Sequence, residues 1–525
     1  FALISFWLYP SSGTETWDHL VETVLGEYIV NSLILLVGVG LITGVLGVST
    51  AWLVAAYEFP WRRHLDWALL LPLSLPTYII SFTYGGMLDE MGPVQQGARF
   101  VLGVPNGVPF WFPEIRSLPG VILVMSLVLY PYVYLICRAV IASQIQHLNE
   151  VAQIMGISGF TRFFKVALPL VRPALVAGIG LAVMEALSDF GSVSFYGVPT
   201  FTTGIYRAWF NLGDLSSAAR LSTLLLLFMF VVIMVEKLSR RRGSVAVSNP
   251  PFSARKQTLS PFKSAIATCY CGSIIVLGFG VPVGQLLLWS LSRYEVLLSS
   301  EFHMMVFRSL TLAIGVALVV VLLALLIRFA QRLTQSSVVA TCNRIASLGY
   351  AIPGSVLSVG VLIPLAHIDT WAIQFTEYWF GWSVGLLLTG SIFALAYSYS
   401  VRFLAVAYNT LDGAFSRVPE QLDQAALCLS KPPSLILKKI HVPILRNSLC
   451  AAVALVLIDI LKELPATLIL RPFNFDTLAT KTYELASEEQ LPEASIYALS
   501  IVAAGLIPIY LLVRSMQLKT QTSNT

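Results

Sequence analysis

Long apolar runs alternate with short polar segments along the whole chain. Each run is long enough to cross a bilayer as a helix, which takes about 20 residues. The runs are 28–57, 67–88, 117–137, 173–197 and 215–235 in the first half, and 264–292, 309–327, 345–367, 378–401, 447–470 and 496–513 in the second. Residues 1–10 are expected to be the outer end of one more span. The pattern predicts an all-α polytopic membrane protein with about twelve transmembrane helices.

Composition supports this class and excludes several others. Of the 525 residues 56% are hydrophobic and only 12% are charged, too few charges to cover the surface of a soluble protein of this length. The net charge of +5 is not concentrated as a nucleic-acid site would require. Six cysteines without a CxxC pair and six scattered histidines predict no metal site, and no cofactor is expected. No lysine follows a glycine, so a phosphate-binding P-loop is absent from the sequence and the chain is not expected to be an ATPase or another enzyme.

A half-polar segment, residues 149–173, separates two of the apolar runs and reads NEVAQIMGISGFTRFFKVALPLVRP. Its apolar side chains are expected to line one face of a short helix, with Arg162 and Lys165 in water. A turn is expected at Gly156, followed by a second helical piece, and another turn is expected at Leu168–Pro169–Leu170. The bland alternative is an ordinary loop helix in which Gly156 is only a C-cap. The segment resembles the EAA loop of bacterial ABC importer permeases, which has the form Glu-Ala-Ala-x-x-x-Gly followed by Leu-Pro. Carried over, the motif falls on Glu150, Ala152, Gly156 and Pro169.

A second copy of the segment, residues 423–447, makes a chance match harder to accept. The distance along the chain from the first motif position to the proline is the same in both copies. The second copy is degenerate, because glutamine replaces the acid and serine the glycine, although Asp423 lies one position earlier and is expected to supply part of the missing charge. Its motif positions are Gln424, Ala425, Ala426, Ser430 and Pro443.

The two halves also correspond outside these loops. LPLSLPTY, with Pro76, matches LGYAIPGS, with Pro353, and the separation of these two prolines is nearly the same as that of Glu150 and Gln424. A nearly constant offset across independent features indicates a duplication. We therefore expect a first permease half at 1–236, a cytoplasmic linker at 237–263 rich in Arg, Ser and Pro, and a second half at 264–525.

The placement of Lys and Arg orients the chain. Alternating the loops puts 24 of the 33 basic residues on the side that carries both EAA-like loops and the linker. By the positive-inside rule this side faces the cytoplasm.

Four acids fall inside predicted spans. Glu185 and Asp189 follow the first EAA-like loop, and Asp459 and Glu463 occupy the matching positions after the second. Charges inside a bilayer cost several kcal/mol unless they are paired or hydrated, so each is a candidate for the translocation pathway. Structural pairing remains an equal alternative, since Asp459 and Lys462 are three residues apart.

The strings DFGSVSFYGVPTFTTGIYRAWF (189–210) and KELPATLILRPFNFDTLATKTYELAS (462–487) resemble the fused permeases of bacterial ferric-iron (Fbp-type) ABC importers. The resemblance covers nearly the whole chain. It implies the type I importer fold in the inner membrane, a dimer of cytoplasmic ABC ATPase subunits docked on the EAA loops, and a periplasmic ferric-iron-binding protein that delivers the cargo. A fused permease for thiamine or another small solute is the alternative within this class, and an ion-coupled secondary transporter that uses Asp189 and Glu463 is the alternative outside it.

Overall fold

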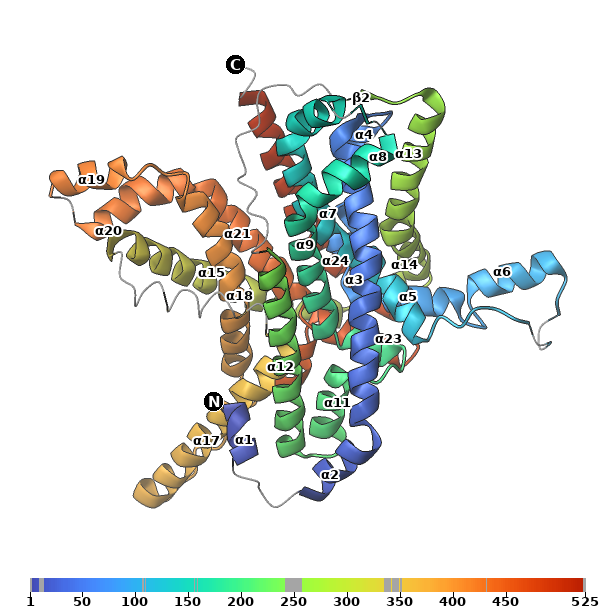
Figure 1. Cartoon of the computed structure of the whole chain (residues 1–525). Helices are drawn as coiled ribbons and strands as arrows, with labels where there is room; N and C mark the ends of the chain where they lie inside the picture. Colours follow the sequence, from blue (N-terminus) through green and yellow to red (C-terminus); the bar gives the residue numbers. More distant parts are fainter. Residues whose placement is uncertain are drawn as a thin grey trace. The chain divides into compact units, whose positions relative to one another are not determined.

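The computed structural model describes residues 2–8, 14–105, 108, 110–154, 156–157, 159–240, 257–334, 341, 349, 352–430 and 432–522. Most of these residues are helical (Figure 1). Contacts divide the chain into two compact units, which we call the N-unit (residues 6–294 and 483–502) and the C-unit (residues 1–5, 295–482 and 503–525). The predicted all-α polytopic class is confirmed.

The N-unit is built on three long helices that pack against one another: α3 (Leu25–Ala56), α7 (Leu118–Ile154) and α9 (Leu168–Ser188). Glycine permits their close approach, because a Cβ added at Gly47 or Gly178 would lie 2.5–2.6 Å from Val133 on α7. The remaining helices of the first half are α2 (Thr14–Thr23), α4 (Arg62–Ala68), α5 (Thr77–Leu88), α6 (Pro93–Leu102), α8 (Gly159–Arg162), α10 (Gly191–Phe195), α11 (Phe201–Tyr206) and α12 (Leu215–Arg240).

Two helices that follow the linker, α13 (Pro261–Ile275) and α14 (Val281–Leu291), also belong to the N-unit. Tyr84 on α5 donates its hydroxyl to the Leu277 carbonyl at 2.6 Å, and the hydroxyls of Ser49 and Tyr270 lie 2.8 Å apart. The packing units are thus not the sequence halves. The expected boundaries at residues 236 and 264 do not coincide with these packing units, and the division by duplication stays a prediction. Most of the expected linker lies outside the described residues.

The C-unit repeats the plan of the first half. It contains α15 (Ser300–Thr334), α17 (Gly354–Phe380), α18 (Ile392–Phe415), α19 (Gln421–Cys428), α20 (Pro433–Ile436), α21 (Val442–Lys462) and α22 (Pro465–Leu470). Helices α15, α18 and α21 pack together, as α3, α7 and α9 do in the N-unit. Helix α1 (Ala2–Leu8) and the helices α23 (Leu478–Ser487) and α24 (Leu491–Thr522) contribute residues to both units.

Within the described part of the chain, eight helices are long and apolar enough to cross a membrane, or nine if one bent pair counts as a single span. The bent pair shows that run 67–88 is broken before Thr77, with an angle of 89° between the segments. Proline explains the break, since Pro76 lacks the N–H that would continue the helix. The span expected at 378–401 is wrong: α17 continues to Phe380, Gly381 ends it with a φ of 70°, and α18 begins at Ile392.

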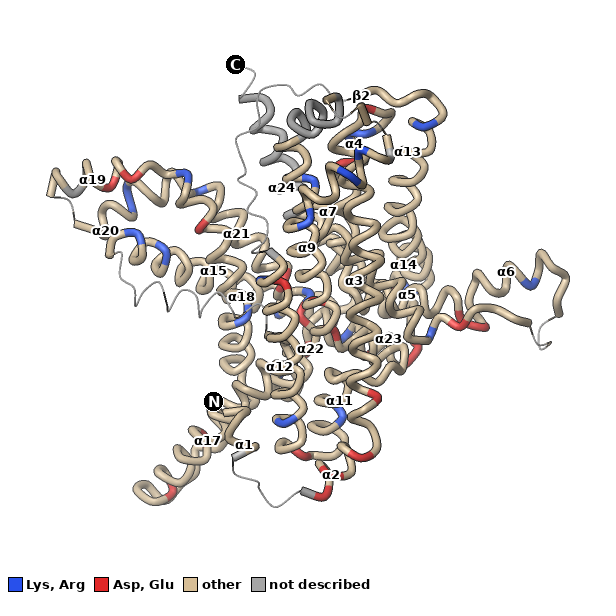
Figure 2. Tube along the Cα trace, in the orientation of Figure 1, with Lys and Arg blue, Asp and Glu red and all other residues tan. Residues whose placement is uncertain are grey.

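A short parallel strand pair joins the end of the linker to the first half. Tyr57–Glu58 (β1) pairs with Gln257–Thr258 (β2). Because β1 directly follows α3, the residues just before α13 are held at the end of α3 that is expected to face the cytoplasm. Lys and Arg gather around α4 and the start of α13, near this pair (Figure 2).

The basic asymmetry and the strand pair together predict a topology that labelling can check. Single cysteines at Ser248 in the linker and at Gln96 on α6, in a cysteine-free background, should react with membrane-impermeant thiol reagents from opposite sides. Gln96 is chosen because its side chain is exposed, whereas that of Gln95 is buried. Labelling of both cysteines from the periplasm would contradict the orientation.

Candidate functional site

The first EAA-like loop begins at the end of α7 and runs into α9. Gly156 follows α7 with a φ of 63°, a left-handed conformation that costs any other L-residue energy, so the turn expected at this glycine is present. The turn expected at Leu168–Pro169–Leu170 is wrong. A π turn, Phe163–Ala167, leads directly into α9, and Pro169 lies in the first helical turn, where its missing N–H costs nothing.

Of the other motif residues, Glu150 and Ala152 lie on the α7 backbone, and their side chains are outside the described residues. Two apolar side chains nearby face outward: Ile154 is 86% exposed and Phe164 is 52% exposed. They leave apolar surface on the loop for a partner to cover.

The amphipathic pattern predicts that Arg162 lies in water. In the structure its side chain is buried and only 1% exposed. Its guanidinium carbon lies 4.9 Å from the ring of Trp52 and 5.3 Å from that of Tyr57. These rings belong to the end of α3 and to β1, so the arginine joins the loop to α3 through cation–π contacts. Lys165 is exposed, as expected.

The second EAA-like loop has the same sequence of local structures as the first. It consists of α19, then Ser430 with a φ of 54°, then α20, a π turn (Leu437–His441) and α21 with Pro443 in its first turn. Gln424, Ala425, Ser430 and Pro443 are exposed, and Ala426 is buried. Serine therefore adopts the left-handed conformation that glycine adopts in the first loop, and this costs about 1–2 kcal/mol.

The sequence suggests that Asp423 supplies an outward charge to the second loop, and the structure contradicts this. The side chain is buried and accepts hydrogen bonds from Arg332 Nε at 2.5 Å and from His441 Nε2 at 2.6 Å. Arg332 also donates to the Phe415 and Val418 carbonyls. Asp423 thus ties α19 to α15 and to the start of α21, so its role in the loop is structural.

The acids expected in the pathway lie where the spans after the two loops end. Asp189 ends α9 and accepts a hydrogen bond from the Ser192 amide at 2.8 Å, and it also accepts one from the Thr77 hydroxyl. Glu463 ends α21 and accepts a hydrogen bond from the Ala466 amide at 3.2 Å. Each carboxylate thus caps the short helix that follows it, α10 or α22.

The surroundings of the two capping acids differ in charge. Arg402 on α18, itself buried, places Nη1 3.4 Å from Glu463 Oε1, and Gly354 leaves the space that both side chains occupy. At Asp189 the described contacts come from a hydroxyl and backbone amides instead. Arg402 therefore lies among packed helices. Glu185 and Asp459 are half-buried one helical turn before Asp189 and Glu463.

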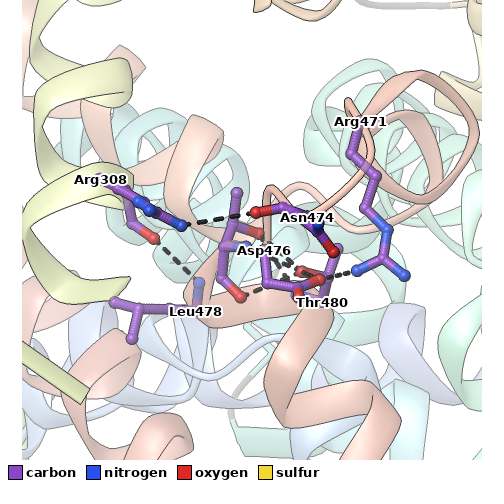
Figure 3. A network of polar contacts seen from close by, with 8 residues as sticks. Arg308, Arg471, Asn474, Asp476, Leu478 and Thr480 are labelled. Atoms are coloured by element: carbon purple, nitrogen blue, oxygen red, sulfur yellow. Dashed lines mark hydrogen bonds and ion pairs between the residues drawn. The ribbon is translucent and has the colours of Figure 1, made fainter. Parts of the chain in front are cut away.

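After each capped helix comes a pair of threonines that start the next one. The Thr200 amide donates to the Thr203 hydroxyl at 2.8 Å, and the Thr477 amide donates to the Thr480 hydroxyl at 2.9 Å. In the C-unit the surrounding network is larger (Figure 3): Arg471 pairs with Asp476, and Arg308 Nη1 lies 3.5 Å from the Asn474 carbonyl. We call these two pairs, Thr200 with Thr203 and Thr477 with Thr480, the threonine boxes. The sequence analysis did not predict them, although the spacing Thr-x-x-Thr recurs at the same offset as Pro76 and Pro353 and could have indicated them.

The left-handed serine generates a testable prediction. Ser430→Gly should make local opening of residues 421–436 about fivefold rarer, because roughly 1 kcal/mol of backbone strain is relieved. Amide hydrogen exchange measures this opening. The matched control is Gly156→Ser, which should raise exchange around 154–162 by a similar factor. Unchanged exchange in both variants would contradict the role assigned to the two turns.

Comparison with known proteins agrees with this architecture. Residues 32–244 match the family described as binding-protein-dependent transport system inner membrane component. Over 506 residues the chain is 26% identical to the Fe(3+)-transport system permease protein FbpB 2 of Haemophilus influenzae, covering 95% of this chain and 92% of that protein.

Sulfate permeases are similar over a shorter stretch. The sulfate transport system permease protein CysT of Salmonella typhimurium is 30% identical over 36% of this chain and 65% of its own length. The probable sulfate transport system permease protein cysT of Nephroselmis olivacea is 33% identical over 29% of this chain and 51% of its own length. With its apolar helices and its paired loops, the chain has the features of a multi-pass permease of binding-protein-dependent transport, and residues 32–244 match that family directly.

Proposed function

We propose that this chain is the fused permease of an ATP-driven importer of ferric iron, fed by a periplasmic ferric-iron-binding protein and driven by a pair of cytoplasmic ABC ATPase subunits. The observation that carries the coupling part is the repeated loop: helix, left-handed residue, short helix, π turn and proline recur in the same order in both halves. A pair of like-built loops suits a pair of like ATPase subunits. The energy comes from those subunits, because the sequence contains no P-loop.

The cargo assignment is supported by the extent of similarity. The Fe(3+) permease is similar over nearly its full length, whereas the chain covers less than two thirds of the sulfate permeases. Carboxylate chemistry supports it as well. Hard cations prefer oxygen ligands, and acids would repel an anion such as sulfate.

Among the four candidate acids, Asp189 is the one we propose to face the cargo. Glu463 is held by a buried arginine, which offsets its charge, while the contacts of Asp189 come from neutral groups. A carboxylate whose charge is not offset lowers the energy of a nearby cation. Glu185 and Asp459, one turn away on their helices, are proposed to contribute a weaker negative field.

Uptake measurements test the cargo. Cells with and without this chain are supplied with radiolabelled ferric iron, thiamine or sulfate. Only iron uptake should depend on the chain. Dependence of thiamine or sulfate uptake alone would overturn the iron assignment and leave the permease class intact.

The two capping acids should respond differently to loss of charge. Asp189→Asn keeps a hydrogen-bond acceptor for the Ser192 amide, so membrane abundance should stay normal while iron uptake falls about tenfold, the effect of roughly 1.4 kcal/mol. Glu463→Gln leaves Arg402 buried without its charge partner, at a cost of about 3–5 kcal/mol, so abundance should fall.

Immunoblotting of membranes alongside uptake separates these effects. Replacing Arg402 by Met together with Glu463→Gln should restore abundance, because the uncompensated charge is removed. If Asp189→Asn lowers abundance in step with uptake, its acid is structural and the pathway assignment fails.

The coupling loops should tolerate bulk unequally. A Cβ at Gly156 meets no atom within 4 Å, so Gly156→Arg adds about 1–2 kcal/mol of backbone strain but no clash within the permease, and its bulk obstructs a docked ATPase. We expect normal abundance, ATP hydrolysis that no longer drives uptake, and a milder defect for Ser430→Arg, whose backbone already carries an L-residue in this conformation. The control Gly156→Ala adds strain without bulk and should retain most uptake.

ATPase activity and uptake of reconstituted transporter provide the measurement. Equal or reversed severity at the two positions would refute the proposed asymmetry of the loops.

A further inference from the structure

Each unit carries an aromatic arm, which joins the start of the helix whose other end leads into the EAA-like loop. The N-arm, residues 89–117, contains α6 and the segment that returns to α7. In Figure 1, α6 extends away from α3 and α7. Its tip exposes large apolar side chains, with Phe100 88% exposed and Trp111 86% exposed, and Val101 and Leu102 exposed beside them.

The C-arm, residues 369–391, contains the last three turns of α17 and the segment that returns to α18. Its sequence from Trp371 to Trp382 holds six aromatic residues, and the Trp371 and Phe375 rings stack at 5.5 Å. Tyr378 is 83% exposed and Trp379 is 67% exposed. The C-arm continues the same helix whose first turns, around Val356 and Val359, are buried in the C-unit.

In each arm, a buried charged side chain forms hydrogen bonds to the backbone of the segment that returns to the next long helix. In the N-arm the buried Arg99 donates to the Val108 carbonyl at 2.9 Å, and its guanidinium lies over the Phe110 ring. In the C-arm the buried Asp369 accepts hydrogen bonds from the Leu388 amide at 2.9 Å and the Thr389 amide at 2.7 Å. The return segment of each arm is therefore held in place by hydrogen bonds to a buried charged side chain. Within the two arms, residues 91–113 and 370–388 hold one charged residue each, Arg99 and Glu377.

The arms occupy matching positions, since α6 and the end of α17 correspond at the same offset that relates Pro76 to Pro353. We propose that both arms lie in the outer membrane–water interface, with their aromatic faces among the lipid headgroups and upper acyl chains of the outer leaflet of the inner membrane. Trp and Tyr are enriched at this level of the bilayer because their rings are amphipathic. The occupant is a lipid surface rather than a soluble partner. The C-arm continues a helix long and apolar enough to span a membrane, α6 of the N-arm belongs to the bent pair that could form one span, and residues 91–113 and 370–388 are almost free of charge.

Energetics also favour lipid over a soluble partner. A soluble binding protein docks and leaves in each transport cycle, and between dockings these side chains would stand in water. Exposed apolar patches of this kind are unfavourable in water and are normally covered. A bilayer covers them continuously, and its anchoring would hold the outer ends of the neighbouring helices at a fixed depth.

Spin-label accessibility tests the proposal on the full chain. Single cysteines at Phe100, Trp111, Tyr378 and Trp379, in a cysteine-free background, are spin-labelled after reconstitution in liposomes that contain phosphatidylglycerol and phosphatidylethanolamine. Power saturation then compares accessibility to oxygen, which partitions into lipid, and to a water-soluble nickel chelate. Matched controls are labels at Glu114 and Glu377, which are exposed and polar.

The four aromatic positions should show an oxygen-to-nickel ratio several-fold above that of the two controls, unchanged when the periplasmic binding protein is added. Nickel accessibility equal to the controls would overturn the proposal, and its loss on adding the binding protein would show that the arms dock that protein. Low accessibility to both reagents would also overturn it, because the aromatic faces would then be covered by protein.

Discussion

The fold depends on how the chain satisfies its backbone where the spans break inside the apolar layer. In lipid an unpaired N–H costs several kcal/mol, so a helix can stop there only if another group accepts the freed hydrogen bonds. Asp189 and Glu463 fulfil this requirement at equivalent places in the two halves, each capping the helix that follows. The positions of α10, α22 and the threonine boxes after them all follow from these two caps. The acids therefore cannot be explained by transport alone, since the architecture needs an acceptor at each break.

The two halves have the same local backbone conformations at these sites, but different side chains stabilise them. At the first loop a glycine adopts the left-handed turn freely, and at the second a serine adopts it with strain. The first loop is fastened by Arg162 between two aromatic rings, the second by Asp423 between Arg332 and His441. At the break after α9 the Asp189 carboxylate accepts a hydrogen bond from a threonine hydroxyl. At the break after α21 the Glu463 carboxylate pairs with a buried arginine. The two loops and the two span breaks thus share a backbone geometry, while the charged groups that support it differ.

Sequence patterns identified the parts of this molecule that depend on local chemistry. Apolar runs predicted most of the helices that are long enough to span a membrane, and Gly156 predicted a turn that is present. They failed where distant residues decide the outcome. The sequence pattern predicts a solvated Arg162, but Trp52 on α3 and Tyr57 just after it pack against its guanidinium. The pattern likewise predicts a surface acid at Asp423, but Arg332 pairs with it. Arg402 directly follows a predicted span, and the partner that its charge meets lies at the far end of α21. The run 378–401 misled because aromatic residues suit an interface as well as a span.

The placement of α13 and α14 constrains how the protein is made. Although they follow the linker, they pack into the N-unit, as do residues 483–502 near the end of the chain. The N-unit is therefore incomplete when the ribosome has passed the end of α12, and its core helices must wait in the membrane for segments that emerge much later. Early spans with unfilled packing surfaces are open to degradation or to wrong neighbours during this interval. A fused chain shortens the wait, because the missing helices arrive on the same polypeptide at high local concentration rather than by diffusion of a second subunit.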